Sequence, residues 1–218
     1  MPYGLDKKVL VICMDQRCYQ LFQKRGYRAI CMDQSLSAFC PWNTKGYDTI
    51  CYLKLEMIYR ILSASYHVVL VDGDIVFLMN PLPDIQSWER ASHVDAWIQN
   101  DAQNNEDTTN LCTGYLFLRS HPSMISLYDC LSKDGRAKYA TCAFDNNDQT
   151  YFNQFVKPYC RWKALSLDHY PNGRVWYDKA DDLRHTAKLV HFNWVHGHIK
   201  MAKMKEHRMW LLTEDEEV

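Results

Sequence analysis

No stretch of this sequence is apolar for long enough to cross a membrane. A membrane-spanning helix needs roughly 20 apolar residues in a row, and every apolar run here is far shorter. The first residues, Met1 to Lys8, also contain no apolar segment of the kind found in signal peptides. An enzyme of the secretory pathway needs one or the other, so we expect this protein to work in a cytoplasm.

The sequence also lacks an excess of charge and lacks paired cysteine spacing. It has 25 basic and 26 acidic residues, for a net charge of −1, which argues against nucleic acid or a membrane surface as a partner. Its nine cysteines contain no C-x-x-C pair, and an odd number without a framework favours reduced thiols. We find no internal repeat and no low-complexity segment.

What is present fits one α/β domain. The 218 residues are 47% hydrophobic, which is enough for a single core. An apolar strand at Val9–Cys13, a helical pattern over Asp15–Gly26 and a second strand at Arg28–Cys31 follow one another closely. This order is typical of a β-α-β unit and predicts a parallel sheet. A longer amphipathic helix is predicted over Asp48–Ser65.

The most informative stretch is the strand Val68–Val71, which runs directly into Asp72-Gly73-Asp74. Its apolar, β-branched composition predicts a buried strand. An unpaired carboxylate is costly to bury, and a glycine lets the chain turn so that both carboxylates face one point. Two such oxygen ligands suit Mg²⁺ or Mn²⁺. The alternative is a strand-end turn in which the aspartates only cap the next element.

A second candidate region follows a predicted strand at Lys188–His191. Three histidines, a glycine and a lysine lie there within ten residues: His191, His196, Gly197, His198 and Lys200. Histidine is a common metal ligand, the glycine permits close approach of a ligand, and a lysine at a helix start can hold phosphate. Alternatively, the first histidine is a packed strand-end residue and the other two are exposed.

Three further segments carry expectations. The prolines Pro81 and Pro83 are expected to end regular structure and to open a surface loop. The polar stretch Asn100–Asn110 lies between two predicted strands and is expected to be a loop that serves as a mobile lid. Asp148 is expected to be the N-cap of a helix that continues through Phe155, and this capping role is the alternative to a catalytic one.

In order and spacing, four blocks resemble the metal-dependent glycosyltransferases of the GT-A fold, in the nucleotide-diphospho-sugar transferase group. The first is Lys54, on the helix before the aspartate pair. The second is the Asp72-Gly73-Asp74 strand with its exit at Asn80-Pro81-Leu82. The third is the strand that begins Leu-Cys-Thr113-Gly114, where the group usually has Asn-Ser-Gly. The fourth comprises Asp148, Gln149, Asn153, His191, Asn193, Gly197, Lys200 and Trp210.

The resemblance implies a GT-A-like, Rossmann-like fold with a mostly parallel central sheet flanked by helices. It implies a single domain over residues 1–212, followed by an acidic tail at 213–218. Within the group, the sequence is also similar to small glycosyltransferases of large algal viruses, which glycosylate their capsids outside the secretory pathway. The expected location for a viral protein of this kind is therefore the host cytoplasm.

The resemblance further implies transfer of a sugar from a UDP-sugar to a hydroxyl of a glycan or glycoprotein, with Mn²⁺ or Mg²⁺ as cofactor and retention of configuration. Asp72, Asp74 and His191 are the implied metal ligands. His196 is the runner-up. The related enzymes place their histidine three residues before the glycine, where this chain has Trp194. The implied donor-binding residues are Lys54, Asp72, Asp74, Thr113, Gly114, Gly197 and Lys200. Asp148 and Gln149 are implied to face the donor sugar or the acceptor at the catalytic centre.

Two other functions stay open on the sequence alone. A D-x-D pair also serves metal-dependent phosphohydrolases, although that class usually needs a further carboxylate cluster or an early nucleophilic aspartate. A nucleotide-sugar-binding module without turnover is the other alternative. The identities of the sugar and the acceptor are not determined by the sequence.

Overall fold

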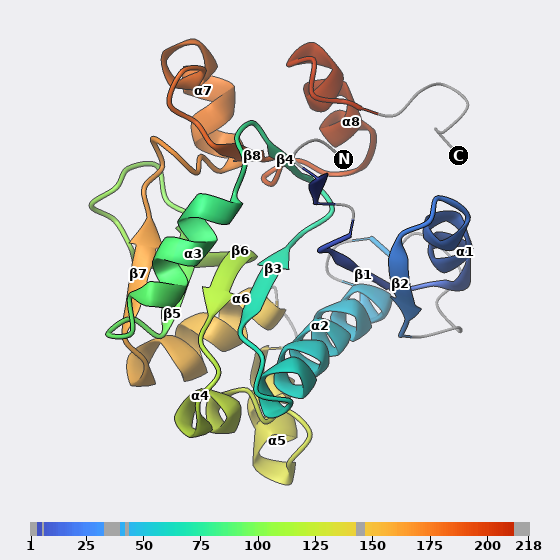
Figure 1. The fold of residues 1–218 in the computed structure, drawn as a ribbon, viewed down its shortest axis with the longest axis vertical. Helices are drawn as coiled ribbons and strands as arrows, with labels where there is room; N and C mark the ends of the chain where they lie inside the picture. The colour runs from blue at the N-terminus through green and yellow to red at the C-terminus, as the bar shows by residue number, and fades with distance from the viewer. Residues whose placement is uncertain (1–3, 6, 33–39, 42–43, 143–146, 212–218) are drawn as a thin grey trace. The chain divides into compact units, whose positions relative to one another are not determined.

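The computed structural model describes residues 4–5, 7–32, 40–41, 44–142 and 147–211 (Figure 1). The chain forms two compact units, residues 1–60 with 128–151 and residues 61–127 with 152–218. The acidic tail expected at 213–218 lies outside the described residues. No helix in the described ranges combines the length and the apolar character needed to cross a bilayer.

The first unit opens with the predicted β-α-β arrangement. Strand β1 (Leu10–Cys13) and strand β2 (Arg28–Cys31) pair in parallel, with helix α1 (Gln16–Lys24) between them. The Asp15 side chain caps α1 by accepting a hydrogen bond from the Cys18 N–H at 2.7 Å. The local apolar pattern was therefore sufficient to predict this segment.

Three helices complete the described part of the first unit: α2 (Lys45–Ser63, whose last three residues belong to the second unit), α5 (Lys133–Cys142) and α6 (Asn147–Tyr151). Helix α2 confirms the predicted amphipathic helix, because Cys51, Leu55 and Ile58 form its buried stripe. Helix α5 was not predicted. Its sequence has no clear apolar periodicity, although the Tyr139 hydroxyl at its centre donates to the Asp48 carbonyl at 2.6 Å.

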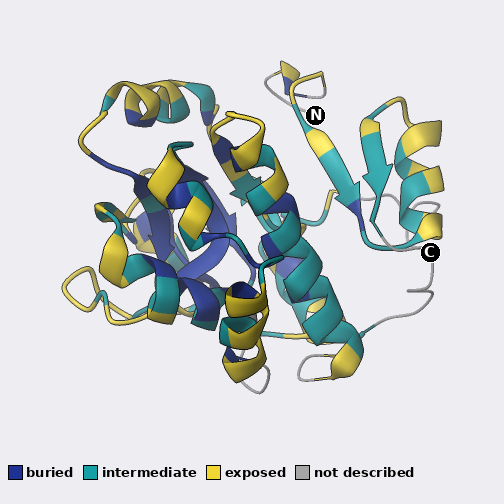
Figure 2. Cartoon of the chain, turned by 90° about the horizontal axis from the view of Figure 1, so that it is seen from below, coloured by how far each residue is buried: buried dark blue, intermediate teal, exposed yellow. Residues whose placement is uncertain are grey.

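The second unit contains a four-stranded sheet in the order β3-β6-β5-β7. The strands are β3 (Val68–Val71), β5 (Ala96–Asn100), β6 (Leu111–Leu118) and β7 (Trp162–Leu165). All eight residues of β6 are buried, and Figure 2 shows β6 and most of β5 as dark-blue strands, with helices that carry exposed, yellow surfaces around them. The expectation that β3 is buried is wrong for two of its residues, because β3 lies at the edge of the sheet and leaves Val69 and Val71 exposed.

The α/β architecture is as expected, but the strand directions correct the expectation of a mostly parallel sheet. Strand β6 runs antiparallel to both β3 and β5, and β5 pairs in parallel with β7. The reason is the connection between β5 and β6, which is the polar segment after Asn100 and contains no helix. A return without a crossover helix brings a strand back in the opposite direction.

Two short strands form a separate antiparallel ribbon. Strand β4 (Ile75–Phe77) pairs with β8 (Leu189–His191), and Ile75 lies opposite His191. The strand predicted at Val68–Val71 is β3, and the turn at Asp72 to Asp74 separates it from β4. This division places the residues on either side of the turn in different sheets.

Helices and helical turns cover the second unit. They are α3 (Leu82–Arg90), α4 (Pro122–Leu127), a π-helical turn (Phe152–Val156), a 3₁₀ turn (Lys157–Tyr159), α7 (Gly173–Leu183) and α8 (Gly197–Glu206). The expectation of a loop at Pro81 and Pro83 is wrong, since these prolines open α3, where a first turn needs no proline N–H. The helix expected through Phe155 instead changes to the π-helical turn at Phe152.

The core of the second unit is rich in aromatic rings. Trp88 from α3 is 5% exposed. Its ring centroid lies within 6.4 Å of the ring centroids of Trp97, Tyr115, Phe117 and Tyr170. A second cluster gathers around Trp176, Val190 and Phe192. Together the two clusters fix β8 and the loop after it, because Leu189 belongs to the first cluster and Val190 to the second.

Candidate metal centre

Asp72, Asp74 and His191 converge in the second unit. Each offers one ligand atom, and these atoms all lie within 4.8 Å of one another. We expected the convergence from parallel strand ends at one edge of a sheet. The structure produces it differently, because the antiparallel pairing of β4 with β8 sets Ile75 opposite His191 and thereby brings Asp74 beside the imidazole. The His191 side chain is almost fully buried, whereas both aspartates are half-buried.

The Asp74 carboxylate accepts from two cationic groups. His191 Nε2 lies 3.2 Å from Asp74 Oδ1, and Lys200 Nζ lies 2.5 Å from Oδ2. Burial alone would raise the pKa of Asp74, but the hydrogen bonds and charges of His191 and Lys200 outweigh burial and hold that pKa well below its usual range. Asp74 is therefore ionised, as a metal ligand must be.

His191 is held on both sides of its ring. Its Nδ1 lies 2.7 Å from Gln99 Oε1, and its Nε2 faces Asp74. Burial lowers the pKa of the imidazolium, but contacts with the Cys112 sulfur and with the Asp74 carboxylate outweigh burial and raise that pKa above its ordinary value of 6.5. A metal ion bound at Nε2 would therefore have to displace the proton that this nitrogen carries.

Gly114 provides the space for the imidazole. A Cβ atom at this position would lie 2.3 Å from His191 Cε1 and 3.0 Å from Asp72 Oδ2. The Gly114 carbonyl in β6 also accepts a hydrogen bond from the Asp72 N–H at 2.8 Å. We predicted Gly114 as a donor-binding residue, and the structure places it in contact with the clustered residues His191 and Asp72.

The helix after the histidine loop brings Lys200 to the cluster. Gly197 has φ +52, a left-handed conformation that glycine adopts readily, and it begins α8. His196, the runner-up ligand, is exposed at the N-cap of α8 and is not one of the three clustered residues. Thr113 is buried in β6 next to Gly114. The geometry thus favours His191 over His196 as a ligand.

The remaining predicted residues lie in the first unit. Lys54 Nζ in α2 forms an ion pair with Asp148 Oδ2 in α6 at 2.8 Å. Helix α6 begins at Asn147, so Asp148 lies within its first turn and pairs with Lys54 rather than simply capping a helix. Gln149 follows Asp148 and is half-buried. The catalytic roles of Asp148 and Gln149, and donor binding by Lys54, stay predictions.

Sequence reasoning missed Gln99, Asp101 and Trp194. The Trp194 backbone has φ +65, an unusual conformation for a bulky residue, and its indole N–H donates to Asp101 Oδ1 at 3.0 Å. The same oxygen accepts from the Asn193 side chain at 3.0 Å. The sequence offered one signal for these residues, the polar pair Gln99-Asn100 at the end of an apolar strand.

The loop that connects β5 to β6 is cross-linked by hydrogen bonds. The Asn100 side chain donates to the carbonyls of Asn104 and Asp107 at 3.1 and 2.9 Å. Asn105 accepts from the Leu167 N–H at 2.7 Å, and Lys157 Nζ donates to the Thr109 carbonyl at 3.0 Å. The loop therefore has a defined conformation, and its ordering by a donor stays a prediction.

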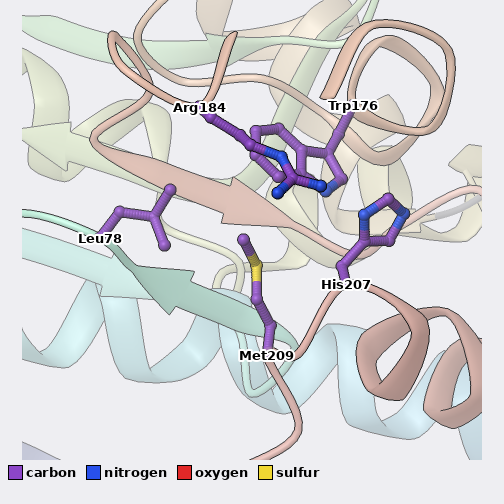
Figure 3. Close-up of a pocket in the computed structure, with 5 residues that line it drawn as sticks. All are labelled: Leu78, Trp176, Arg184, His207 and Met209. Atoms are coloured by element: carbon purple, nitrogen blue, oxygen red, sulfur yellow. The ribbon is translucent and has the colours of Figure 1, made fainter. Parts of the chain in front are cut away.

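A cavity of about 290 Å³ lies elsewhere in the second unit (Figure 3). Its lining comes from the end of β4, from α7 and from the chain after α8: Leu78, Trp176, Arg184, His207 and Met209. None of these residues belongs to the Asp72, Asp74 and His191 cluster, so this cavity is not assigned to the nucleotide sugar.

The cluster has the donor set of a site for a hard divalent cation. Carboxylate oxygens suit Mg²⁺ and Mn²⁺, and a single imidazole nitrogen is compatible with Mn²⁺. A cationic group, the Lys200 ammonium, already contacts Asp74, which shows that the site accommodates positive charge. The residues therefore fit a divalent metal.

The chain is similar in sequence to known glycosyltransferases. The chain is 23% identical to UDP-galactose:fucoside alpha-3-galactosyltransferase of Dictyostelium discoideum, over 98% of this chain and 40% of that protein. It is also 23% identical to UDP-D-xylose:L-fucose alpha-1,3-D-xylosyltransferase of Arabidopsis thaliana, over 96% of this chain and 63% of that protein. This chain therefore spans less than two thirds of the length of either relative.

The fold is similar to that of a solved glycosyltransferase involved in the glycosylation of the major capsid of PBCV-1. The TM-score is 0.53 at 14% sequence identity, over 90% of this chain and 98% of that one. A sequence model described as nucleotide-diphospho-sugar transferase matches residues 4–209, nearly the whole chain. The chain therefore belongs to the nucleotide-diphospho-sugar transferase family.

Proposed function

We propose that this protein transfers a sugar from a UDP-sugar to a hydroxyl of a glycan or glycoprotein, with Mn²⁺ or Mg²⁺ as cofactor. The observation that carries the proposal is the convergence of Asp72, Asp74 and His191 within 4.8 Å. A nucleotide sugar has a diphosphate leaving group, and a divalent cation at this cluster would neutralise the charge that develops on it. Membership of the family supplies the reaction class.

The residues of the site divide the work. Asp72, Asp74 and His191 would hold the cation, and binding of the cation to Asp74 would release the Lys200 ammonium that now pairs with this carboxylate. Lys200 would then bind the diphosphate, as a lysine at a helix start can. Thr113, Gly114 and Gly197 would line the donor site, with Lys54 as a further donor contact. Asp148 and Gln149 would face the reacting sugar.

The relatives suggest what to test as donor and acceptor. Two of them are named for UDP-galactose or UDP-xylose as donor and for a fucoside or L-fucose as acceptor. Both names describe an alpha product, and the sugar of these donors is itself α-linked. We therefore propose a fucose-containing acceptor and retention of configuration. Residues 1–212 would form the transferase domain, and the proposed location is a cytoplasm.

The first experiment measures UDP binding by titration calorimetry with and without Mn²⁺. We expect UDP to bind much more tightly with the metal, because Asp72, Asp74 and His191 would hold the cation and its charge would favour binding of the diphosphate. Asp181→Asn is the control for substitutions of the clustered aspartates. It removes an exposed carboxylate of α7 that pairs with Arg184 on the surface. Metal-independent UDP binding would contradict the proposed role of the cluster.

Turnover is then measured as UDP release from UDP-galactose and UDP-xylose, with and without a fucoside. Release of UDP that increases with the fucoside supports a transferase. Metal-dependent UDP binding without any release would indicate a nucleotide-sugar-binding module. Release of inorganic phosphate from a phosphate ester, without UDP binding, would indicate a phosphohydrolase.

A further inference from the structure

We infer that Gln99 is a positioning residue that fixes the ring and the tautomer of His191, so that Nε2 is presented to the metal ion. The inference rests on the proposed metal site and extends it to a residue that does not contact the metal. Gln99 lies in β5 and is fully buried. A buried amide needs partners for both its oxygen and its nitrogen, and these partners determine its orientation.

Two backbone carbonyls determine which way the Gln99 amide points. Its Nε2 donates to the Tyr170 carbonyl at 3.1 Å and to the Pro171 carbonyl at 3.2 Å. A carbonyl oxygen can only accept, so the amide nitrogen must be the atom that faces them. The amide oxygen is thereby turned toward His191 Nδ1, at 2.7 Å.

The orientation of Gln99 determines the proton position on His191. Because the Gln99 oxygen has no proton to give, Nδ1 must carry the hydrogen of this bond. In the neutral imidazole the lone pair then resides on Nε2, the atom that faces Asp74 at 3.2 Å. Removal of a residue that hydrogen-bonds a histidine ligand in this way typically weakens metal binding by about 10–100-fold.

The fold builds this arrangement through two irregular features. The register between β5 and β6 shifts between Ile98 and Gln99, so that Gln99 pairs with Cys112. Bulges of this kind redirect side chains and are common beside active sites. The segment that accepts from Gln99 also holds the His191 backbone, because the His191 N–H donates to the Pro171 carbonyl at 3.2 Å. Gln99 and His191 are thus fixed to the same short segment.

The test uses two substitutions of Gln99 and a matched control. Gln99→Met keeps a long side chain of similar volume but removes the strong acceptor, whereas Gln99→Glu keeps an acceptor oxygen. The control is Asn100→Ala, at the next residue of β5, which also removes a buried amide but one that bonds to the loop carbonyls of Asn104 and Asp107. Circular dichroism and thermal melting check that each variant is folded.

The main readout is Mn²⁺ affinity measured by electron paramagnetic resonance on the full chain, which does not depend on turnover. We expect Gln99→Met to weaken Mn²⁺ binding by about 10–100-fold. Gln99→Glu should recover only part of this loss, because its second oxygen can face the Tyr170 and Pro171 carbonyls only when the carboxyl is protonated, and Asn100→Ala should bind Mn²⁺ as the parent does. Equal loss in Gln99→Met and Asn100→Ala would overturn the inference, since Gln99 would then act through packing alone. Unchanged affinity in Gln99→Met would overturn it as well.

A second readout identifies the ligand atom. In the Cd²⁺-loaded parent, nitrogen-15 NMR of the His191 ring should show a proton on Nδ1 and the metal on Nε2, and Gln99→Met should lose this single pattern. A single unchanged pattern in Gln99→Met would overturn the inference. UDP release is measured in parallel, so that a parent protein that binds Mn²⁺ but releases no UDP would contradict the proposed function and leave the role of Gln99 supported. A parent that binds no Mn²⁺ would contradict both.

Discussion

At the scale of single residues, the site depends on compensation of buried charge. Asp74 accepts from His191 and Lys200, and these contacts stabilise its carboxylate. At a metal site formed by Asp72, Asp74 and His191, the Lys200 ammonium and the His191 proton would have to leave this carboxylate. The same residues that make the site stable without metal therefore also set how strongly it binds metal.

We expect Asp74→Ala to abolish metal-dependent UDP binding and to leave the protein folded. The substitution removes a central oxygen ligand, whereas His191 can lose its proton and so avoid an unpaired buried charge. Calorimetry with UDP and Mn²⁺ measures the binding, and thermal melting measures the fold. If this variant bound UDP and Mn²⁺ like the parent, the aspartate pair would have a structural role only.

Mn²⁺ affinity should rise with pH beyond the ordinary titration range of histidine. The Asp74 carboxylate raises the pKa of His191 above 6.5, so the imidazolium persists at neutral pH, and metal binding must release its proton. While His191 stays protonated, the affinity should increase by up to about tenfold per pH unit. Titrations between pH 6 and pH 9 should show this slope.

Substitutions of the two histidines test whether His191 causes the expected dependence of Mn²⁺ affinity on pH. His191→Ala should weaken Mn²⁺ binding and flatten the dependence on pH, whereas His196→Ala should change both much less. The reverse ranking would make His196 the ligand. If neither substitution changed the pH profile, the proposed convergence of the two motifs on one metal ion would be wrong.

At the scale of elements, close approach of β6 to the histidine is a requirement of the site. In Gly114→Ala, the new Cβ would overlap the His191 ring, 2.3 Å from Cε1 in the present geometry. We expect the ring to be displaced and Mn²⁺ affinity to fall by at least tenfold, comparable to the loss of an outer-shell partner. Gly73→Ala is the control, because a Cβ there has no atom within 4 Å. Equal Mn²⁺ affinity in both variants would contradict this account.

The start of β5 is fixed to the start of β7 by a carboxylate clamp. Asp95 is 4% exposed and accepts from the N–H, Nε and Nη2 of Arg161 at 2.9, 3.0 and 2.6 Å. These hydrogen bonds, more than the opposing effect of burial, lower the pKa of Asp95. The clamp therefore contributes stability above the unfolded-state pKa of about 3.9, and this contribution is lost as pH falls through the lower folded-state pKa.

Asp95→Asn should destabilise the protein by about 1–3 kcal/mol at neutral pH, because it weakens a buried, charge-assisted set of hydrogen bonds. It should also reduce the loss of stability below about pH 4, where the parent protonates Asp95. Urea unfolding at several pH values measures both effects. Asp181→Asn, at an exposed ion pair, should change stability by less than about 1 kcal/mol. Similar effects of the two substitutions would contradict the clamp.

At the scale of the whole molecule, we propose that residues 1–212 form the transferase domain and that residues 213–218 are not needed for it. Deletion of residues 213–218 should therefore leave the melting temperature and the metal-dependent UDP binding unchanged. The physical reason is that the run Glu214 to Glu217 carries charge of one sign, which favours a solvated segment. A clear loss of stability or of UDP binding on deletion would show that the tail is part of the domain.

The sequence by itself determined the elements whose signals are local. The β-α-β unit, helix α2 and the aspartate pair after Val71 follow from apolar periodicity and from the cost of burying carboxylates. His191 was a candidate because a histidine ends an apolar strand. Such signals depend on neighbouring residues in the chain, so they are visible without a structure.

The tertiary structure alone decided how these pieces meet. Strand direction depends on the connection between β5 and β6 and on pairing partners distant in sequence, so the mixed sheet was not visible in the pattern. The antiparallel pairing of β4 with β8 brings together Asp74 and His191, which are more than a hundred residues apart. Gln99 acquires its role from carbonyls at Tyr170 and Pro171. Long-range pairing and amide orientation have no local signature, and for this reason only the folded chain reveals them.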